Sequence, residues 1–61
     1  MKPLFKEAQI VRDKQFRETH MILKHLRAGG INYYSVRNVS GPGAYEGHEV
    51  FEEKDLEPIE G

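Results

Sequence analysis

Hydrophobic positions recur at helical spacing over residues 14–28. Five positions fall on one face of a helix at steps of three, three, one and three: Phe16, Thr19, Ile22, Leu23 and Leu26. The opposite face carries Lys14, Arg17, Met21 and Lys24. Asp13 is suited to the N-cap, and Gly29 is suited to the left-handed conformation that ends a helix. The pattern therefore predicts one amphipathic helix, ending at a double glycine.

Strand patterns lie on the C-terminal side of this segment. Ile31 to Asn38 is rich in β-branched and aromatic residues, and its alternation separates Ile31, Tyr33 and Ser35 from Tyr34 and Val36. A Gly- and Pro-containing loop is predicted over residues 39–47, a further short strand over 48–51, and a turn over 52–56. Residues 4–11 fit either a short strand or an early extension of the helix, and we favour the strand.

These elements predict a single α+β domain spanning residues 1–61, in which one helix packs on a short antiparallel sheet of two to three strands in the order β-α-β-β. The chain has 61 residues and no Cys. Neither a disulfide nor a Cys-based zinc site supports so small a domain, so core packing and self-association are the remaining supports. We therefore expect a homodimer.

Charge divides the chain into two unlike parts. Residues 1–38 carry eight Lys and Arg against three acidic residues, whereas residues 39–61 carry one Lys against seven acidic residues. Such a division fits attraction between the two parts, within one chain or between chains, better than a polyanion-binding surface. No apolar run is long enough to span a membrane, so a cytoplasmic protein without membrane contact is expected.

A family resemblance is carried by Leu23, Leu26, Ala28, Gly30 and Ile31, and further on by Glu49, Val50, Asp55, Leu56 and Glu57. With these residues the chain resembles the small family of putative prokaryotic signal-transducing proteins. The resemblance implies a β-α-β-β sandwich of ferredoxin-like character. It also implies a role in binding and regulation, and it brings no catalytic residue.

Candidate chemical sites are weak. His20 and His25 are five residues apart, about 500° around a helix, so they do not form a zinc pair, and we expect neither a metal nor a cofactor. The glycine-rich loop before His48 lacks the lysine and serine of a phosphate-binding loop. A domain with a single helix on a small sheet also has little volume for an active site, so we expect no enzymatic activity.

The sequence therefore favours a small non-enzymatic regulatory protein that binds another protein or a second copy of itself. The residues predicted for this contact are Tyr34, Val36, Tyr45 and Phe51. The alternative is an accessory protein that binds nucleic acid through the basic helix face, with Arg17, Lys24 and Arg27.

Overall fold

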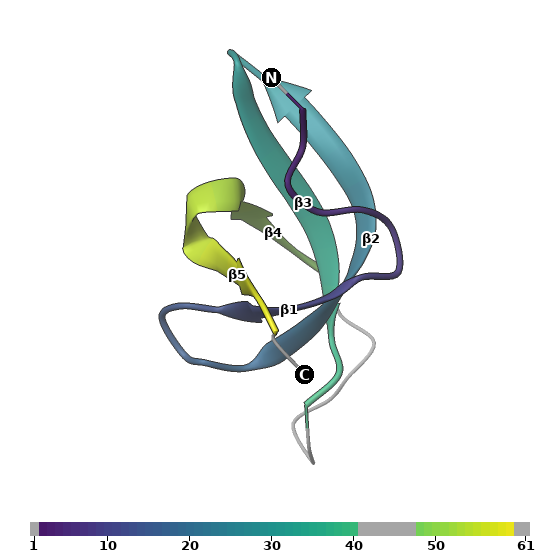
Figure 1. The fold of residues 1–61 in the computed structure, drawn as a ribbon, viewed down its shortest axis with the longest axis vertical. Coiled ribbons are helices and arrows are strands. Elements are labelled where there is room, and N and C mark those ends of the chain that lie inside the picture. The colour runs from purple at the N-terminus through teal and green to yellow at the C-terminus, as the bar shows by residue number, and fades with distance from the viewer. Residues whose placement is uncertain (1, 41–47, 60–61) are drawn as a thin grey trace.

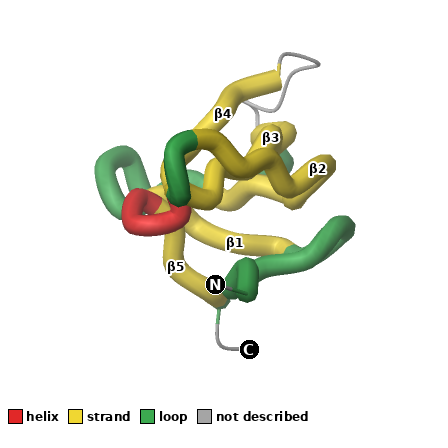
Figure 2. The backbone as a smooth tube through the Cα atoms, turned by 90° about the horizontal axis from the view of Figure 1, so that it is seen from above, coloured by secondary structure: helices red, strands yellow, loops and turns green. Residues whose placement is uncertain are grey.

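Five β-strands form one antiparallel sheet in a computed structural model that describes residues 2–40 and 48–59 (Figure 1). The elements are β1 (Ile10–Asp13), β2 (Thr19–Ala28), β3 (Ile31–Asn38), β4 (His48–Glu52), the 3-10 turn η2 (Glu53–Asp55) and β5 (Leu56–Pro58). The strand order is β4-β3-β2-β1-β5, so the first four strands form a meander and β5 returns to pair with β1. Figure 2 shows that the sheet curls, with β4 and β5 at opposite sides of the molecule.

The predicted helix over residues 14–28 is wrong, and with it the α+β class and the β-α-β-β order. The described residues contain no α-helix, and residues 19–28 form the longest strand of an all-β fold. A shift of register between Ile22 and Lys24 explains the misleading pattern. A β-bulge adds one residue to a strand and breaks the alternation of side chains, so Ile22, Leu23 and Leu26 came to lie at helical spacing.

Gly29 and Gly30 form the tip of a β-hairpin rather than the end of a helix. Their φ angles are 57° and 78°, and β2 pairs with β3 on both sides of them, beginning at Ala28 opposite Ile31. Two consecutive residues with positive φ characterise the type I′ turn, whose twist matches that of the two strands. The left-handed conformation expected at Gly29 is therefore correct, but the element it serves is a hairpin.

The strand predicted over residues 31–38 is confirmed as β3, and the one over 48–51 is confirmed as β4. The sheet has five strands instead of two to three because β1, β2 and β5 also join it. Residues 4–9 contain no strand, and β1 begins only at Ile10. The glycine-rich loop predicted over residues 39–47 lies outside the described residues from position 41 onward.

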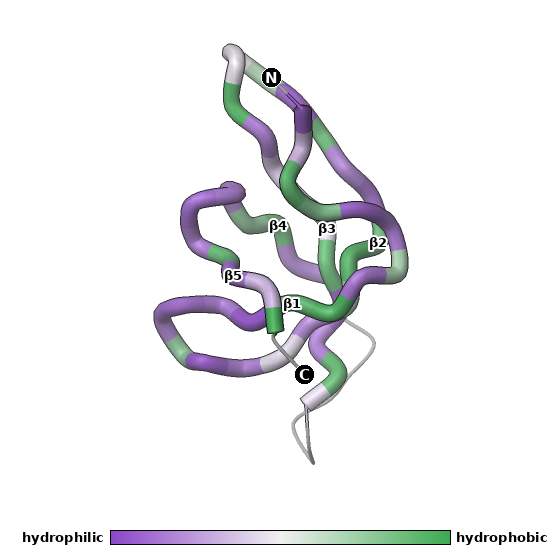
Figure 3. The backbone as a smooth tube through the Cα atoms, viewed as in Figure 1, coloured by the Kyte–Doolittle hydropathy of each residue, from purple (hydrophilic) through white to green (hydrophobic). Residues whose placement is uncertain are grey.

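The core lies inside the curl of the sheet. It consists of Phe5, Val11, Ile22, Tyr34, Val36 and Leu56, with Phe51 packed against them. Figure 3 shows hydrophobic and hydrophilic residues following one another along the strands. Phe5 comes from the N-terminal segment, which hydrogen-bonds to β2 through Ala8 N to Ile22 O at 2.8 Å and Ile22 N to Gln9 O at 2.9 Å. The segment before β1 therefore supplies part of the core.

Candidate functional site

Two of the residues predicted for partner contact are in the core. Tyr34 and Val36 are each 0% exposed, so the prediction that they form the exposed face of their strand is wrong. The predicted alternation of β3 is correct, but Tyr34 and Val36 point to the core, whereas the prediction placed them on the partner-contact side. The reason is tertiary: β3 is covered on the Tyr34 side by Phe5, whose ring meets that of Tyr34 edge-on at 5.3 Å between centroids.

The other two predicted contact residues have different positions. Phe51 is half-buried, lies opposite Tyr34 in the β3–β4 ladder, and packs against the core. Its ring centroid lies 5.2 Å from that of His20. Tyr45 lies outside the described residues. The described members of the predicted contact set therefore support the fold from within.

The basic residues of the alternative prediction do not share a surface. Arg17, Lys24 and Arg27 are all exposed, but Arg17 lies in the turn between β1 and β2. Lys24 lies opposite Ser35, and Arg27 lies opposite Asn32, on β3. Ser35 and Asn32 are three residues apart on a strand, so they point to opposite faces of the sheet. The three residues would form one basic stripe only on the predicted helix, and residues 19–28 form a strand instead.

A polar cluster connects the core to η2. Glu53 Oε2 accepts hydrogen bonds from the Tyr34 hydroxyl at 2.5 Å, the Leu4 amide at 2.9 Å and Asn32 Nδ2 at 3.4 Å. The Tyr34 oxygen in turn accepts from the Phe5 amide at 3.3 Å. These bonds join the N-terminal segment, β3 and η2 around one carboxylate.

The cluster shifts the acidity of both its ionisable members. The hydrogen bond from Tyr34, followed by that from the Leu4 amide, lowers the pKa of Glu53 below its ordinary value of 4.5. Burial, together with the hydrogen bond to Glu53, raises the pKa of the Tyr34 hydroxyl above its ordinary value of 10.0. Tyr34 therefore keeps its proton and acts as the donor, so the pair is a structural bond rather than an acid–base pair.

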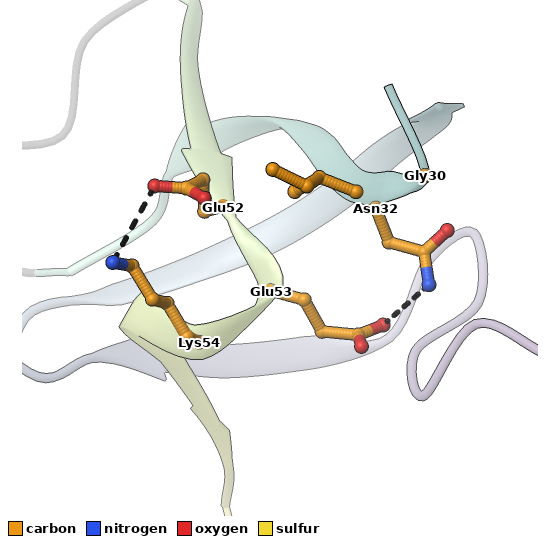
Figure 4. Close-up of a pocket in the computed structure, with 6 residues that line it drawn as sticks. Gly30, Asn32, Glu52, Glu53 and Lys54 are labelled. Atoms are coloured by element: carbon orange, nitrogen blue, oxygen red, sulfur yellow. Dashed lines mark hydrogen bonds and ion pairs between the residues drawn. The ribbon is translucent and has the colours of Figure 1, made fainter. Parts of the chain in front are cut away.

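A shallow hollow of about 270 Å³ lies beside this cluster, lined by Gly30, Ile31, Asn32, Glu52, Glu53 and Lys54 (Figure 4). Figure 4 shows the Glu53 side chain reaching towards Asn32, and Glu52 paired with Lys54. The Glu52 carboxylate lies 3.8 Å from Lys54 Nζ. The volume is below the range of about 300–1,000 Å³ of small-molecule pockets. Its ionisable side chains bond to residues of the chain itself, which gives the hollow little means to orient a substrate.

A second buried polar pair shapes the turn between β1 and β2. Asp13 and His20 are each 1% exposed, and His20 Nε2 lies 2.7 Å from Asp13 Oδ2. The Asp13 carboxylate also accepts hydrogen bonds from the backbone amides of Phe16, Arg17 and Glu18. Asp13 therefore caps backbone amides as its sequence position predicts, but those of a turn.

Asp13, Glu18 and His20 place possible metal-binding atoms within 4.8 Å of one another. The geometry nevertheless assigns the cluster to the turn. Burial on its own raises the pKa of Asp13, but hydrogen bonds with His20 and with the Phe16 and Glu18 amides outweigh it and hold the pKa below 3.8. The Asp13 carboxylate is thus charged, and both of its oxygens already accept hydrogen bonds within the turn or from His20. His20 Nδ1 is buried without a hydrogen-bond partner among the described residues.

The side of β2, β3 and β4 that faces away from the core carries a mixed apolar and basic surface, which we call the outer face. Cross-strand partners define it, because directly opposite residues point to the same side of a sheet. Its rows are Leu26–Tyr33–Glu52, Lys24–Ser35–Val50 and Met21–Arg37–His48. Val50 is 59% exposed, whereas Tyr33, Leu26 and Met21 are half-buried. Apolar side chains from β2, β3 and β4 therefore lie together on this face.

The two edges of the sheet differ. β5 is three residues long and contains Pro58, which lacks a backbone N–H. β4 is five residues long, with the sequence HEVFE and no proline, and among the described strands it pairs only with β3. Short strands and prolines protect an edge against pairing with another chain. The β4 edge therefore lacks two of the protections found at the β5 edge.

The sequence contains signals for this surface that helical periodicity concealed. A Gly-Gly pair between two segments of strand-forming residues is a hairpin signal. A hairpin would have placed Leu26 opposite Tyr33, as observed. The alternation of β3 already grouped Tyr33 with Ser35, so only the choice of the buried side was missing.

Comparison with known proteins gives no relative: no family model, no curated protein and no solved structure matches the chain significantly. The fold that the family resemblance implies is not the fold of this chain, because the helix that defines it is absent from the described residues. Those residues also contain no helix long and apolar enough to cross a membrane.

Proposed function

We propose that the protein is a small non-enzymatic binding module that acts through protein–protein contact at its outer face. The observation that carries the proposal is the position of Val50, which is 59% exposed on an edge strand and lies in the same sheet surface as Tyr33 and Leu26. Burial of an apolar side chain stabilises a complex by about 25 cal/mol per Å² removed from water, and aromatic side chains such as tyrosine are enriched at interfaces.

The polar clusters support a binding role over a catalytic one. Asp13 and Glu53, whose pKa values are shifted, both accept several hydrogen bonds from the chain and hold a turn and the N-terminal segment in place. A catalytic acid or base needs to reach a substrate proton. The shifted carboxylates of this chain are occupied by its own backbone amides and side chains.

A photo-crosslinking experiment tests the proposal. Ser35 lies in the middle row of the outer face, between Lys24 and Val50. Benzoylphenylalanine at Ser35, activated in the cells that produce the protein, is expected to form a protease-sensitive adduct. Tyr33→Ala is expected to reduce its yield, because it removes the neighbouring aromatic surface. Benzoylphenylalanine at Lys14, which is exposed in the β1–β2 turn, is the matched control. Equal adduct yields at the two positions would overturn the proposal.

A second candidate is nucleic-acid binding at the same surface. It is favoured by Lys24 and Arg37, which are both exposed and lie on the outer face together with Tyr33. Cationic side chains beside an aromatic ring suit a single-stranded nucleic acid. A crosslinked adduct at Ser35 that is sensitive to nuclease would favour this candidate over the first. So would an affinity of the protein for single-stranded nucleic acid that falls steeply with added salt.

A further inference from the structure

We propose that the partner of the β4 edge is a second copy of this chain, and that two β4 strands pair antiparallel about a twofold axis at Val50. The inference goes beyond the proposed function, because it assigns a partner to the β4 edge of the sheet and leaves the outer face open for a further partner. It starts from the edge itself: an antiparallel strand with one neighbour uses alternate backbone groups for that neighbour, and the others point away from the sheet. In β4 the outward-pointing groups belong to alternate residues of a five-residue strand that contains no proline.

Symmetry limits the possible registers. In a twofold antiparallel pair that keeps the same face outward, the axis passes through one residue and its twin. With the axis at Val50, all five residues of β4 find a partner: Val50 faces Val50 of the second copy, Glu49 faces Phe51, and His48 faces Glu52. With the axis at Glu49, two carboxylates face each other, and fewer residues pair. With the axis at Phe51, Glu52 faces Val50. Only the Val50 register pairs the whole strand.

The side chains of this register are self-complementary. Val50 is the exposed apolar residue of β4, and it lies opposite Val50 of the second copy at the centre of the joint. His48 and Glu52 both belong to the outer face, so each end of the joint brings a basic side chain opposite an acidic one. Opposite charges directly across a pair of strands are favourable, and like charges are unfavourable. Glu52 also lies 3.8 Å from Lys54, which places a positive charge at each end of the joint.

The joined sheets extend the proposed binding surface. Two outer faces become continuous across the β4 edges, so the rows that contain Tyr33 and Leu26 in one copy run on into the second copy. Half-buried apolar side chains on both copies then lie on one ten-stranded surface. This doubles the area offered to a further partner without a new element of structure.

Disulfide trapping tests the register, because the chain contains no Cys. Opposite residues of an antiparallel pair have Cα atoms about 4.5–5.5 Å apart, within the range of about 4.4–6.8 Å that a disulfide accepts. Val50→Cys is therefore expected to form a covalent dimer at least tenfold faster than Phe16→Cys, whose position in the β1–β2 turn is similarly exposed at 68%. The unfolding midpoint of each variant serves as the check on folding.

A mixing experiment tests the direction of the strands. In the Val50 register, His48 lies opposite Glu52 of the second copy and about 14 Å along the strand from its own twin. His48→Cys and Glu52→Cys are expected to crosslink slowly when alone and rapidly when mixed, giving the mixed dimer as the main product. Fast crosslinking of either variant alone would overturn the register.

Sedimentation equilibrium from micromolar to millimolar concentration measures the affinity. His48→Glu places two carboxylates opposite each other at both ends of the joint and is expected to weaken dimerisation roughly 2- to 30-fold. Gln15→Glu adds the same charge in an exposed turn and is the matched control. Equal effects of the two variants would overturn the inference.

The outcomes separate this inference from the proposed function. A dimer in which Val50→Cys crosslinks no faster than Phe16→Cys uses another surface, so the inference fails while protein contact is retained. A monomer at all concentrations also overturns the inference. The Ser35 photo-adduct then decides the proposed function separately, because it detects a foreign protein as well as a second copy.

Discussion

The hydroxyl of Tyr34 lies 2.5 Å from Oε2 of Glu53, which fastens the core strand β3 to the 3-10 turn before β5. The same carboxylate oxygen accepts a hydrogen bond from the amide of Leu4, and the tyrosine oxygen accepts one from the amide of Phe5. Together these hydrogen bonds attach the N-terminal segment to the core, in which six hydrophobic side chains of the described residues are buried.

Removing the Tyr34 hydroxyl is expected to destabilise the fold. Tyr34→Phe keeps the ring but leaves Glu53 without its closest donor and the buried Phe5 amide without an acceptor. Loss of one partner from a buried hydrogen bond costs about 1–3 kcal/mol. Urea denaturation measures the change in the free energy of unfolding. Tyr33→Phe, on the half-buried outer face, is the control and should change it by less than about 0.5 kcal/mol.

The Glu53 cluster is expected to make stability depend on pH. Its hydrogen bonds lower the pKa of Glu53 in the folded state below 4.5, so the stabilisation is present above the unfolded-state pKa and is lost as pH falls through the folded-state pKa. The difference in unfolding free energy between wild type and Glu53→Gln should therefore be largest near neutral pH and shrink below about pH 4.5.

Glu57→Gln is the control for that titration. Glu57 pairs with Arg12 at 4.0 Å on the surface, where ion pairs contribute little to stability. A difference between wild type and Glu53→Gln that stays constant from pH 7 to pH 3 would contradict the assigned role of the Glu53 carboxylate.

Asp13 is expected to be the most sensitive carboxylate of the β1–β2 turn. Asp13→Asn replaces one accepting oxygen with a donor, which then faces either His20 or a backbone amide. Because the group is 1% exposed, water cannot replace the lost partner, and we expect a cost of about 1–3 kcal/mol. Thermal unfolding measures it. Asp55→Asn makes the same carboxylate-to-amide change at an exposed position and should leave the thermal unfolding midpoint almost unchanged.

A pair of valines tests which side of the sheet is the core. Val36 is 0% exposed and Val50 is 59% exposed. Val36→Ala is expected to reduce the free energy of unfolding by roughly 1–3 kcal/mol, since it removes buried methyl groups and leaves a small cavity. Val50→Ala should change it by less than about 0.5 kcal/mol. The reverse order in denaturant unfolding would mean that the outer face is the buried one.

Substitutions at the hairpin tip are expected to change stability only through the backbone conformation that the new residue prefers. A Cβ at Gly29 meets no atom within 4 Å, so any cost arises from its φ of 57°. Gly29→Ala should cost about 1–2 kcal/mol. Gly29→Asn should cost less, because asparagine is favoured in the type I′ turn. Similar losses for both variants, measured by thermal unfolding, would argue against this turn type.

The sequence by itself determined the local features of this protein. Strand propensity located β3 and β4, short polar side chains identified Asp13 as a capping residue, and paired glycines marked a change of direction at residues 29 and 30. Each depends on interactions within a few residues, which are the same in any fold. The alternation of Tyr33, Tyr34 and Ser35 was determined in the same way.

Only the tertiary structure decided between helix and strand for residues 19–28 and between inside and outside for β3. Met21, Leu23, Leu26 and Arg27 are compatible with a helix, and the bulge after Ile22 gave the segment a helical spacing. Pairing with β1 and β3 outweighs that preference because it buries Ile22 in the core beside Val11 and Val36. The buried side of β3 was then set by Phe5 and Leu56, which lie 29 and 22 residues away from Tyr34 in the chain.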